Sequence, residues 1–474
     1  MIKVEVAGHM IFDPQFSSDT DAIASALDRG RRLAAAGQDD LAKSCYLEVL
    51  QRDPTHFAAL NELGALAFSS DHLSAAHTAY HQAVRYHPDN PVGRVNLGNL
   101  LYKQGNLAEA RAQFEAVLAR DSCHVQAHQG LARTLLDLGD AAAAEPHFQQ
   151  GFSGHAIVAQ RYRGTMPPVP VLLLVSARGG NIPTQGILDD RIFGINAVYA
   201  EFYDPAQPLP RHAVVFNAIG DADICEAALT GARTLLRRTI APVINSPQQV
   251  GLTGRFANAA RLADVPGVVA PAIRSFKRSA LQGQSGFTFP LLLRAPGFHT
   301  GQHFLLVESP RDLPAAVAAL PGEEILALQY LDARGADGMA RKYRVMFVDG
   351  VLYPLHLAIS ANWKVHYYTA DMAANPTHRE EERRFLDDMA SVLGEGAITA
   401  LGEVSRWMGL DYAGIDFAMR PDGAVLLFEA NATMIVHPPG PEAIWDYRRA
   451  PVARVLEAVQ RMVRARSEQV RRPS

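Results

Sequence analysis

Residues 412–432 read YAGIDFAMRPDGAVLLFEANA, and this stretch decides the organisation of the C-terminal half of the chain. Two apolar-rich runs flank Pro421-Asp422-Gly423, a turn signal, so the pattern predicts an antiparallel hairpin. If Asp422-Gly423 forms a two-residue loop, Asp416 lies directly opposite Glu429, with β-carbons roughly 5 Å apart. A three-residue loop would move the two acids to opposite faces unless a bulge restored parity.

Both acids lie inside strongly apolar runs, where an unpaired charge is expensive. A surface hairpin with scattered acids, the alternative, is therefore disfavoured. Alternation predicts that Val425, Leu427, Glu429 and Asn431 share one face of the second arm. Two adjacent carboxylates repel unless something positive lies between them. With the amide oxygen of Asn431 they form a hard oxygen ligand set, so the hairpin predicts a Mg²⁺ or Mn²⁺ site.

Composition gives little reason to expect nucleic acid or a membrane as a partner, because the net charge of the 474 residues is only −4. The length predicts two or three domains. Three widely spaced cysteines suggest a reducing compartment. The start MIKVEVAGHMIF lacks the pattern of a secretion signal, and the longest apolar run is too short for a bilayer. We expect a cytoplasmic protein.

A period of 34 residues organises the N-terminal third. Four positions keep this step: Gly37, Asp71, Gly105 and Gly139. Aromatic residues keep it too: Tyr46, Tyr80, Phe114 and Phe148. Small residues of the first helices do the same: Gly30, Gly64, Gly98 and Ala132. This period resembles four tetratricopeptide repeats, placed at residues 19–157 after an N-terminal segment of residues 1–18.

Such repeats stack into a curved solenoid whose concave face commonly binds peptides. The resemblance therefore implies a peptide or protein segment as the partner in the groove. The alternative is an array that mediates self-association or stiffens the protein. Polar residues of the first helices are the candidate groove contacts: Asn61, Arg94, Asn96, Asn99 and His128.

Residues 158–168 are predicted to be a linker, because prolines interrupt the repeat register. Strand-like and helix-like segments then alternate through residues 169–255, which predicts a parallel sheet covered on both faces. The turn at Gly179-Gly180-Asn181 lacks G-x-G-x-x-G, so we exclude a Rossmann cofactor site.

An acid-x-Asn strand facing an Asp on its neighbour resembles the metal-binding end of the ATP-grasp fold. That family includes glutathione synthetase, D-alanine–D-alanine ligase and the ribosomal-protein glutamate ligases. The resemblance implies that residues 169–255 form the domain that precedes this fold, with substrate docking at the strand ends of residues 215–217 and 243–247. It implies an ATP-grasp domain at residues 256–465 and leaves residues 466–474 as a frayed tail. The fold class is thus multidomain, an all-α repeat solenoid followed by an α/β domain and an α+β ATP-grasp domain.

The same resemblance assigns phosphate-binding groups. Arg255 opens a helix and Arg294 ends a strand, and at both places the family usually has Lys. Arg keeps the charge and adds a planar fork. Gly297 and Gly301 would let loop N–H groups approach the phosphates.

The segment ILALQYL resembles the strand that passes the adenine, so backbone groups of Gln329, Tyr330 and Leu331 would pair with the base. A second hairpin, turning at residues 349–350, carries Lys342 and Arg344 on one face of its first arm. Arg344 matches the Arg that many members place near the transferred phosphoryl group, and Lys342 is the neighbouring contact to the nucleotide.

The segment after this hairpin is a candidate acceptor-side loop, with His356, Asn362 and Lys364 as substrate contacts. A half-buried packing loop is the alternative. The charged run of residues 378–393 is interpreted as the solvated face of a helix.

The family's usual reaction implies an ATP- and Mg²⁺-dependent carboxylate–amine ligase that works through an acyl phosphate. Arg344 and Arg294 would be its catalytic residues, acting by positioning and charge neutralisation. Two alternatives stay open: a kinase-like phosphotransferase, and a nucleotide-binding scaffold without turnover.

Overall fold

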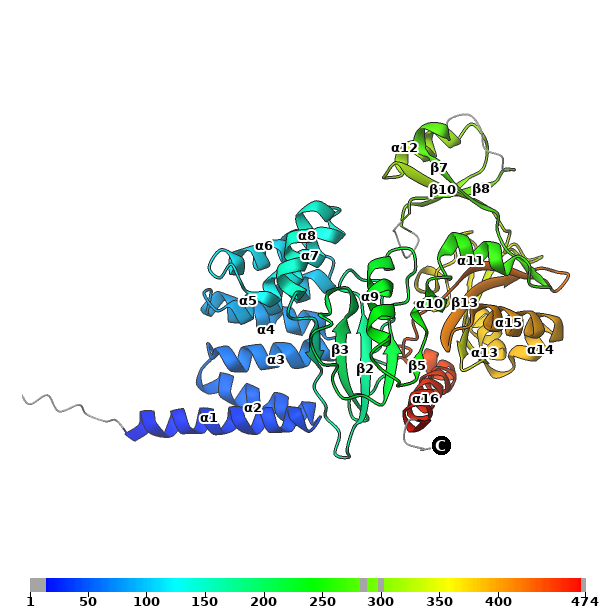
Figure 1. Ribbon diagram of the computed structural model, residues 1–474. Helices are drawn as coiled ribbons and strands as arrows, with labels where there is room; N and C mark the ends of the chain where they lie inside the picture. The colour runs from blue at the N-terminus through cyan, green and yellow to red at the C-terminus, as the bar shows by residue number, and fades with distance from the viewer. Residues whose placement is uncertain (1–13, 282–287, 297–301, 470–474) are drawn as a thin grey trace, which may run out of the picture. The chain divides into compact units, whose positions relative to one another are not determined.

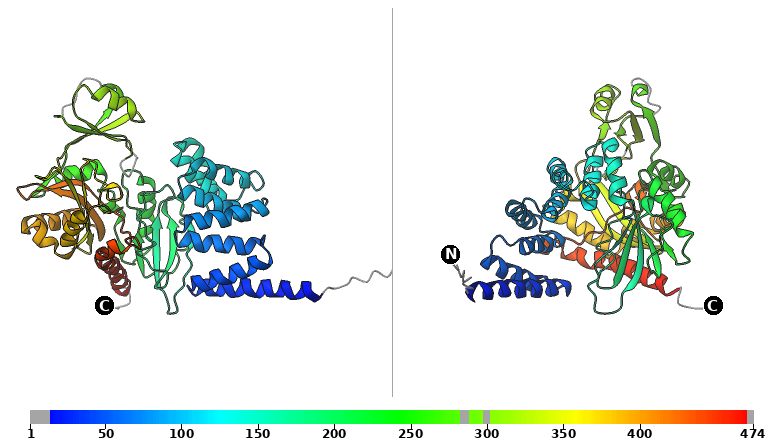
Figure 2. Two further views of the ribbon diagram at one scale, coloured as in Figure 1. Left: turned by 180° about the vertical axis from the view of Figure 1, so that it is seen from behind. Right: turned by 60° about the vertical axis from the view of Figure 1, so that its left-hand side comes forward.

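The computed structural model describes residues 14–281, 288–296 and 302–469, and these form two compact units. The first unit ends at His155 and includes Arg163–Thr165. The second unit takes in Ala156–Tyr162 and the chain from Met166 onward. Figures 1 and 2 show the helical first unit in blue to cyan.

The first unit is a stack of antiparallel helix pairs, as the 34-residue period predicts (Figure 1). The first array helix begins at Pro14, five residues before the predicted start of the repeats. The helices are α1 (Pro14–Ala35), α2 (Asp39–Arg52), α3 (Phe57–Ser69), α4 (Leu73–Tyr86), α5 (Pro91–Lys103), α6 (Leu107–Leu118), α7 (Val125–Asp137) and α8 (Ala141–Phe152).

The turn inside each pair requires a left-handed residue. Residues 37, 71, 105 and 139 have φ of 70°, 60°, 80° and 85°. Glycine adopts this conformation without steric cost, and Asp is among the residues that tolerate it best. The 34-residue period at these positions therefore reflects a left-handed backbone conformation that recurs in each turn.

The small residues of the first helices lie against the aromatic residues. A β-carbon added to Gly98 would lie 2.7 Å from the Phe114 ring, and Gly64 would meet Tyr80 at 2.6 Å. The Phe114 ring is fully buried and has Gly130 of the next repeat on its other side. The aromatic ring thus fills the space between helices that only small residues can border.

Replacing Gly98 by Ala is expected to destabilise the repeat unit by about 1–3 kcal/mol, because the Phe114 ring has no room to move. The gain in helix propensity is only about 1 kcal/mol. Urea unfolding followed by circular dichroism measures the change, with the exposed neighbour substitution Asn99→Ala as control. A stabilised Gly98→Ala variant would contradict this account.

The second unit begins with a five-stranded sheet of order β1-β3-β2-β4-β5. Its strands are β1 (Ile157–Ala159), β2 (Val169–Val175), β3 (Phe193–Tyr199), β4 (Val214–Asn217) and β5 (Val243–Ile244). All pairs are parallel except β1–β3, so the predicted parallel sheet is confirmed. The predicted linker is wrong at its start, because Val158 and Ala159 belong to β1 and pair with β3. The covering helices are η1 (Ala200–Phe202), α9 (Glu226–Leu236) and α10 (Pro247–Val250).

A smaller antiparallel sheet of order β7-β10-β8-β9 has its own core. The strands are β7 (Ile273–Lys277), β8 (Leu291–Arg294), β9 (Phe304–Val307) and β10 (Glu324–Gln329). The two short helices of this part are η2 (Arg278–Ala280) and α12 (Leu313–Ala319). Leu293, Val307 and Ile325 are fully buried between the sheet and α12.

The third sheet has the order β12-β11-β13-β14-β6 and contains both predicted hairpins. Its strands are β6 (Val268–Val269), β11 (Ala340–Val348), β12 (Val351–Ser360), β13 (Tyr412–Met419) and β14 (Val425–Asn431). The β11–β12 turn at Asp349-Gly350 has two positive φ angles, 50° and 79°, which suit a two-residue hairpin loop. The helices are α11 (Arg255–Leu262), η3 (Tyr367–Thr369), α13 (Pro376–Asp387), α14 (Met389–Leu393), α15 (Glu395–Met408), η4 (Ala443–Trp445) and α16 (Asp446–Gln469).

One hydrophobic core runs from the parallel sheet through the third sheet to α16. The predicted boundary at residues 255/256 therefore does not separate two independent cores. The predicted tail is wrong over residues 466–469, which belong to α16, and residues 470–474 lie outside the described residues. Arg466 donates to Asp349 at 2.6 Å and to Asp411 at 3.2 Å. Within the described ranges, no helix combines the length and hydrophobicity that crossing a bilayer needs.

Candidate functional site

The hairpin of β13 and β14 places Asp416 opposite Glu429, as predicted, but by the other route. The loop has three residues, closed by a hydrogen bond from the Arg420 N–H to the Ala424 carbonyl at 2.9 Å. Asp416 pairs with Glu429 and Phe417 pairs with Leu427, so Phe428 is an extra, bulged residue. The two-residue loop is wrong, and the bulge restores the parity that brings the acids together.

The bulge also changes which residues of the second arm share a face, so the predicted face is wrong. Val425 pairs with Met419 and Leu427 pairs with Phe417, on the side opposite to Asp416. Val425 and Leu427 belong to the hydrophobic core. They therefore do not share the face of Glu429.

A row of polar residues crosses four neighbouring strands. His356 of β12 pairs with Arg344 of β11, Arg344 with Asp416 of β13, and Asp416 with Glu429 of β14. Residues that pair across strands share a face of the sheet. The predicted cations and carboxylates are thus neighbours on one face.

Asp416 is held by both predicted cations of β11. The Arg344 guanidinium donates Nε to Oδ1 at 2.6 Å and Nη2 to Oδ2 at 2.9 Å, and Lys342 Nζ donates to Oδ2 at 3.0 Å. Burial opposes ionisation of Asp416, but Arg344 and Lys342 outweigh it and hold the carboxyl pKa far below its usual range. The aspartate is therefore a buried, doubly paired anion.

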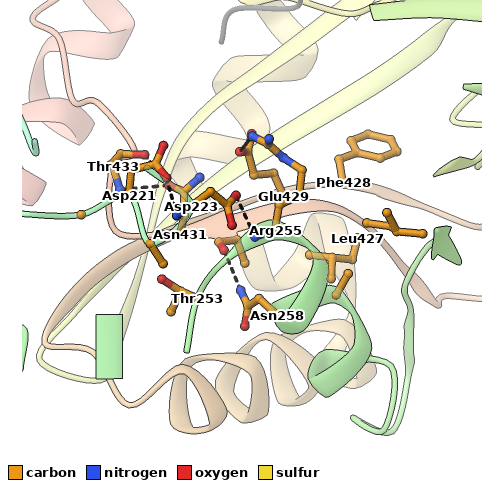
Figure 3. A pocket seen from close by; sticks show the side chains of 15 residues that line it. Asp221, Asp223, Thr253, Arg255, Asn258, Leu427, Phe428, Glu429, Asn431 and Thr433 are labelled. Carbon is orange, nitrogen blue, oxygen red and sulfur yellow. Dashed lines mark hydrogen bonds and ion pairs between the residues drawn. The ribbon is translucent and has the colours of Figure 1, made fainter. Parts of the chain in front are cut away.

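Glu429 is paired with Arg255, which opens α11 (Figure 3). Arg255 Nη2 lies 2.7 Å from Glu429 Oε1, and Asn258 Nδ2 donates to the Ala430 carbonyl at 2.7 Å, which ties α11 to β14. Burial disfavours the charge of Arg255, yet Glu429 leaves its pKa raised. The Glu429 side chain keeps one third of its surface exposed, and this exposed part faces the cavity described next.

A cavity opens beside this pair, at the ends of β4 and β14. Its polar lining comes from the loop after β4, from the start of α11 and from the end of β14 (Figure 3). These residues are Asp221, Asp223, Thr253, Arg255, Asn258, Glu429, Asn431 and Thr433. Sequence reasoning missed the loop acids; the signal for them was Asp221-x-Asp223 in the loop that follows the β4 strand.

Arg294 adds a further cation at the end of β8. Its guanidinium lies over the Phe304 ring, 5.6 Å from the centroid. Burial and the neighbouring charge of Arg255 lower the pKa of Arg294 to about 10. The predicted partners in the following loop, Gly297 and Gly301, lie outside the described residues.

The predicted adenine contacts lie at the end of β10. The Gln329 N–H donates to the Ala272 carbonyl at 2.8 Å, so this N–H is used inside the protein, and a contact of the Gln329 backbone with a base stays a prediction. Tyr330 and Leu331 follow directly after β10. Their role toward a base stays a prediction.

The predicted substrate residues fall into two environments. Asn362 and Lys364 are exposed. The ring of Trp363, between them in the sequence, packs edge-on against the Phe304 ring, with 5.5 Å between the ring centroids. His356 is buried, and the Tyr367 ring covers it with 4.8 Å between the ring centroids. The His356 Nδ1 atom has no hydrogen-bond partner among the described residues. Burial and Arg344 hold the pKa of His356 well below its ordinary value, so the imidazole is neutral. Substrate contact by these three residues stays a prediction.

The interpretation of residues 378–393 as a solvated face is wrong for Glu382, which is fully buried. Its carboxylate accepts from the Leu357 N–H at 3.3 Å, from Tyr367 Oη at 3.1 Å and from Tyr447 Oη at 2.5 Å. Arg448 lies 3.3 Å away. Burial raises the pKa of Glu382. This carboxylate orders the segment that covers His356.

Asp416 and Glu429 fit a hard divalent cation by chemistry and by placement, since both are oxygen donors on one face. Both oxygens of Asp416 are, however, engaged by cations in this state. The Asn431 amide oxygen accepts from the Thr433 N–H and hydroxyl, each at 3.0 Å, and its role as a ligand stays a prediction. In the part of the chain that the structure describes, no group of three or more His, Cys, Asp or Glu side chains is arranged around a common metal position.

The predicted docking ends of β4 and β5 serve to position the β13–β14 hairpin. Asn217 Nδ2 donates to the Asn245 carbonyl at 2.8 Å. Asn245, with φ of 58°, donates Nδ2 to the Tyr412 carbonyl and accepts from the Tyr412 N–H, both at 2.8 Å. Both asparagines are fully buried, so they clamp the start of β13 and are not exposed to a substrate.

Replacing Asn245 by Ala is expected to destabilise the second unit by about 2–4 kcal/mol, because both backbone groups of Tyr412 lose their partners in a buried place. Chemical denaturation measures this loss. The exposed residue Gln248 on α10 gives the matched control, Gln248→Ala. If the free energy of unfolding falls by less than about 1 kcal/mol, the net value of one ordinary hydrogen bond, Asn245 does not hold β13 in place.

In the first unit, the groove candidates are mostly engaged within the array. Asn96 Nδ2 donates to Asn61 Oδ1 at 2.7 Å, and Arg94 donates to the Pro88 carbonyl at 2.8 Å. His128 is buried and bonds to His147 at 2.7 Å between their Nδ1 atoms. Asn99 alone among these five candidates is exposed.

Comparison with known proteins identifies the repeats. Family models described as tetratricopeptide repeat match residues 67–122 and 95–151, so these helices are tetratricopeptide repeats, a module that implies protein partners. No curated protein matches the chain.

Three similar solved structures each match less than a third of this chain. A MamA protein is 19% identical, covering 29% of this chain and 74% of that one, with a TM-score of 0.26. The pilF protein of Pseudomonas aeruginosa is 20% identical, covering 28% and 62%, with a TM-score of 0.27. A tetratricopeptide repeat protein from Parabacteroides merdae is 18% identical, covering 28% and 53%, with a TM-score of 0.26.

Proposed function

We propose that this protein is an ATP-grasp carboxylate–amine ligase that uses ATP with Mg²⁺ or Mn²⁺. Its tetratricopeptide repeats would recruit a peptide or protein that carries one of the two reactants. The observation that carries the proposal is the polar row on one face of the third sheet. Arg344 of that row and Lys342 beside it bind Asp416, and Glu429 of the row binds Arg255 of α11.

The order of the sheets supports the proposal. A mostly parallel sheet, a small antiparallel sheet and a larger, mostly antiparallel sheet follow one another, as the resemblance to ATP-grasp enzymes implies. The small sheet ends β8 in Arg294, and the larger sheet holds the carboxylates. Arg294 and the carboxylates, to which the resemblance assigns phosphate and metal binding, thus lie on these two sheets, which supports the proposal.

In the proposed reaction, an oxygen of the substrate carboxylate attacks the γ-phosphorus of ATP and ADP leaves. The substrate's amine then attacks the acyl carbon of the resulting acyl phosphate, phosphate leaves, and the amine nitrogen loses a proton. The products are an amide, ADP and phosphate. A Mg²⁺ ion, when bound by Asp416, Glu429 and Asn431, would supply charge neutralisation for the β- and γ-phosphates.

The side chains of this chain would contribute positioning and charge. Arg344 lies beside the carboxylates and would offset charge on the transferred phosphoryl group. Arg294 and Arg255, buried near one another, would hold the preceding phosphates. Burial of these guanidinium groups strengthens their interaction with an anion, because the local dielectric is low.

The test is incubation of the full chain with ATP, Mg²⁺ and a cell extract, followed by mass spectrometry. ADP and phosphate formed together with a new amide support the ligase. ADP with a stable phosphorylated product identifies a phosphotransferase instead and overturns the proposal. An absence of nucleotide turnover with every extract also overturns it, and leaves a nucleotide-binding scaffold.

A further inference from the structure

The cations that a nucleotide would need already hold the carboxylates that a metal would need. Lys342 and Arg344 occupy both oxygens of Asp416, with three contacts between 2.6 and 3.0 Å. Arg255 holds Glu429 at 2.7 Å. Each of these cations and carboxylates would therefore have two competing partners: the oppositely charged side chain that it pairs with in the protein, and a phosphate or metal ion of the bound ligand.

A lone divalent cation meets an unfavourable site at Asp416. The Asp416 side chain is 6% exposed, and two cations face this single carboxylate. The other groups around it are the neutral, buried His356 on β12 and Glu429, which is already paired with Arg255. To reach an Asp416 oxygen, a metal ion must displace Lys342 or Arg344 and leave that cation unpaired in a buried place.

A polyphosphate removes this obstacle. Its oxygens offer Lys342, Arg344 and Arg255 a multiply charged acceptor, and guanidinium groups bind phosphate bidentately. Once these cations turn to the phosphates, the carboxylates lose their partners and two anionic groups remain side by side. A divalent cation between carboxylate and phosphate oxygens then lowers the energy of both.

We propose that Lys342 and Arg344 make metal binding conditional on a polyphosphate, so that this site takes up Mg²⁺ or Mn²⁺ only together with a di- or triphosphate. The inference rests on the proposed nucleotide site and concerns how that site selects its ligand. Linkage requires that the metal strengthen polyphosphate binding by the same factor. The site then discriminates a metal–polyphosphate complex from free metal.

The experiment measures binding to the full chain without any catalytic readout. Mn²⁺ alone is titrated and followed by its electron paramagnetic resonance signal. Inorganic tripolyphosphate alone is titrated by calorimetry in the presence of a chelator, and the preformed Mn²⁺–tripolyphosphate complex is titrated last. We expect saturable binding of tripolyphosphate and of the complex, with the complex at least about tenfold tighter. Mn²⁺ alone should bind at least about tenfold more weakly than it does in the complex.

The Lys342→Met variant gives the sharper test, because Arg344 still pairs with Asp416 and the carboxylate stays compensated. Loss of this lysine should strengthen binding of Mn²⁺ alone by about tenfold and weaken binding of tripolyphosphate alone by a similar factor. A merely destabilised protein would lose both. Lys277→Met, at an exposed lysine of β7, is the matched control and should change neither.

Two outcomes overturn the inference separately from the proposed function. If Mn²⁺ alone binds wild-type protein as tightly as in the complex, the conditional site is wrong, and the ligase proposal stands. The same holds if Lys342→Met weakens Mn²⁺ binding. If tripolyphosphate does not bind with or without Mn²⁺, the proposed nucleotide site fails, and the inference fails with it.

Discussion

Replacing Glu429 by Ala is expected to abolish ATP turnover while the repeat unit stays folded. The carboxylate lies on the face of Asp416, lines the cavity and is paired with Arg255 at 2.7 Å. Its loss would remove a metal ligand and also the group that orients Arg255. We expect kcat to fall by about 100-fold or more, the cost typical of removing one electrostatic contact from a transition state.

The Glu429→Gln variant separates charge from shape, because the amide keeps the size and one acceptor oxygen. It should be impaired nearly as strongly as Glu429→Ala, since a neutral amide oxygen is a weaker ligand for a hard cation. Glu324→Ala, at an exposed glutamate of β10, is the control and should keep full activity. ADP release measures turnover, and far-ultraviolet circular dichroism checks the helices. Wild-type turnover in Glu429→Ala would remove Glu429 from the mechanism.

Local periodicity predicted much of this architecture because its physical causes are local. The 34-residue step recurs in left-handed turns and in ring-to-glycine contacts such as Phe114 against Gly98, which each repeat sets within itself or with its neighbour. The facing positions of Asp416 and Glu429 were also predictable from the hairpin. The three-residue loop and the bulge that bring these two acids face to face were not predictable in the same way. The bulge at Phe428 depends on how Val425 and Leu427 fit a core built from distant segments.

The residues that sequence reasoning misjudged are those whose surroundings come from far along the chain. Glu382 stands in a run of three glutamates that looks solvated, yet Tyr447 and Arg448 of α16 enclose it. Asn245 lies at the end of a strand, where the sequence predicted substrate docking, but its hydrogen-bond partner is Tyr412, 167 residues later. No window of sequence contains both members of such a pair. Burial of a polar residue is thus the property that local patterns predict least well.

Replacing Asp416 by Ala is expected to destabilise the second unit by about 3–5 kcal/mol, because Lys342 and Arg344 would be left buried without their carboxylate. Asp416→Asn should cost less, since the amide oxygen still accepts one hydrogen bond. The pH dependence has a definite sign. The folded-state pKa of Asp416 is depressed, so its contribution is complete above the unfolded value of about 3.9 and is lost as pH falls below it.

Urea unfolding of wild type and Asp416→Ala between pH 3 and pH 7 measures both effects, and tryptophan fluorescence reports on the second unit through Trp363, Trp407 and Trp445. The difference between the two proteins should be largest near neutral pH and should shrink below about pH 3.9, because the Asp416 carboxylate then takes up a proton in the unfolded chain while Lys342 and Arg344 keep it ionised in the folded protein. Combining Asp416→Ala with Lys342→Met should recover part of the lost stability, because one of the two orphaned cations is then absent. A difference below about 1 kcal/mol at pH 7 would be the value of an exposed ion pair and would contradict the buried, doubly paired aspartate on which the site depends.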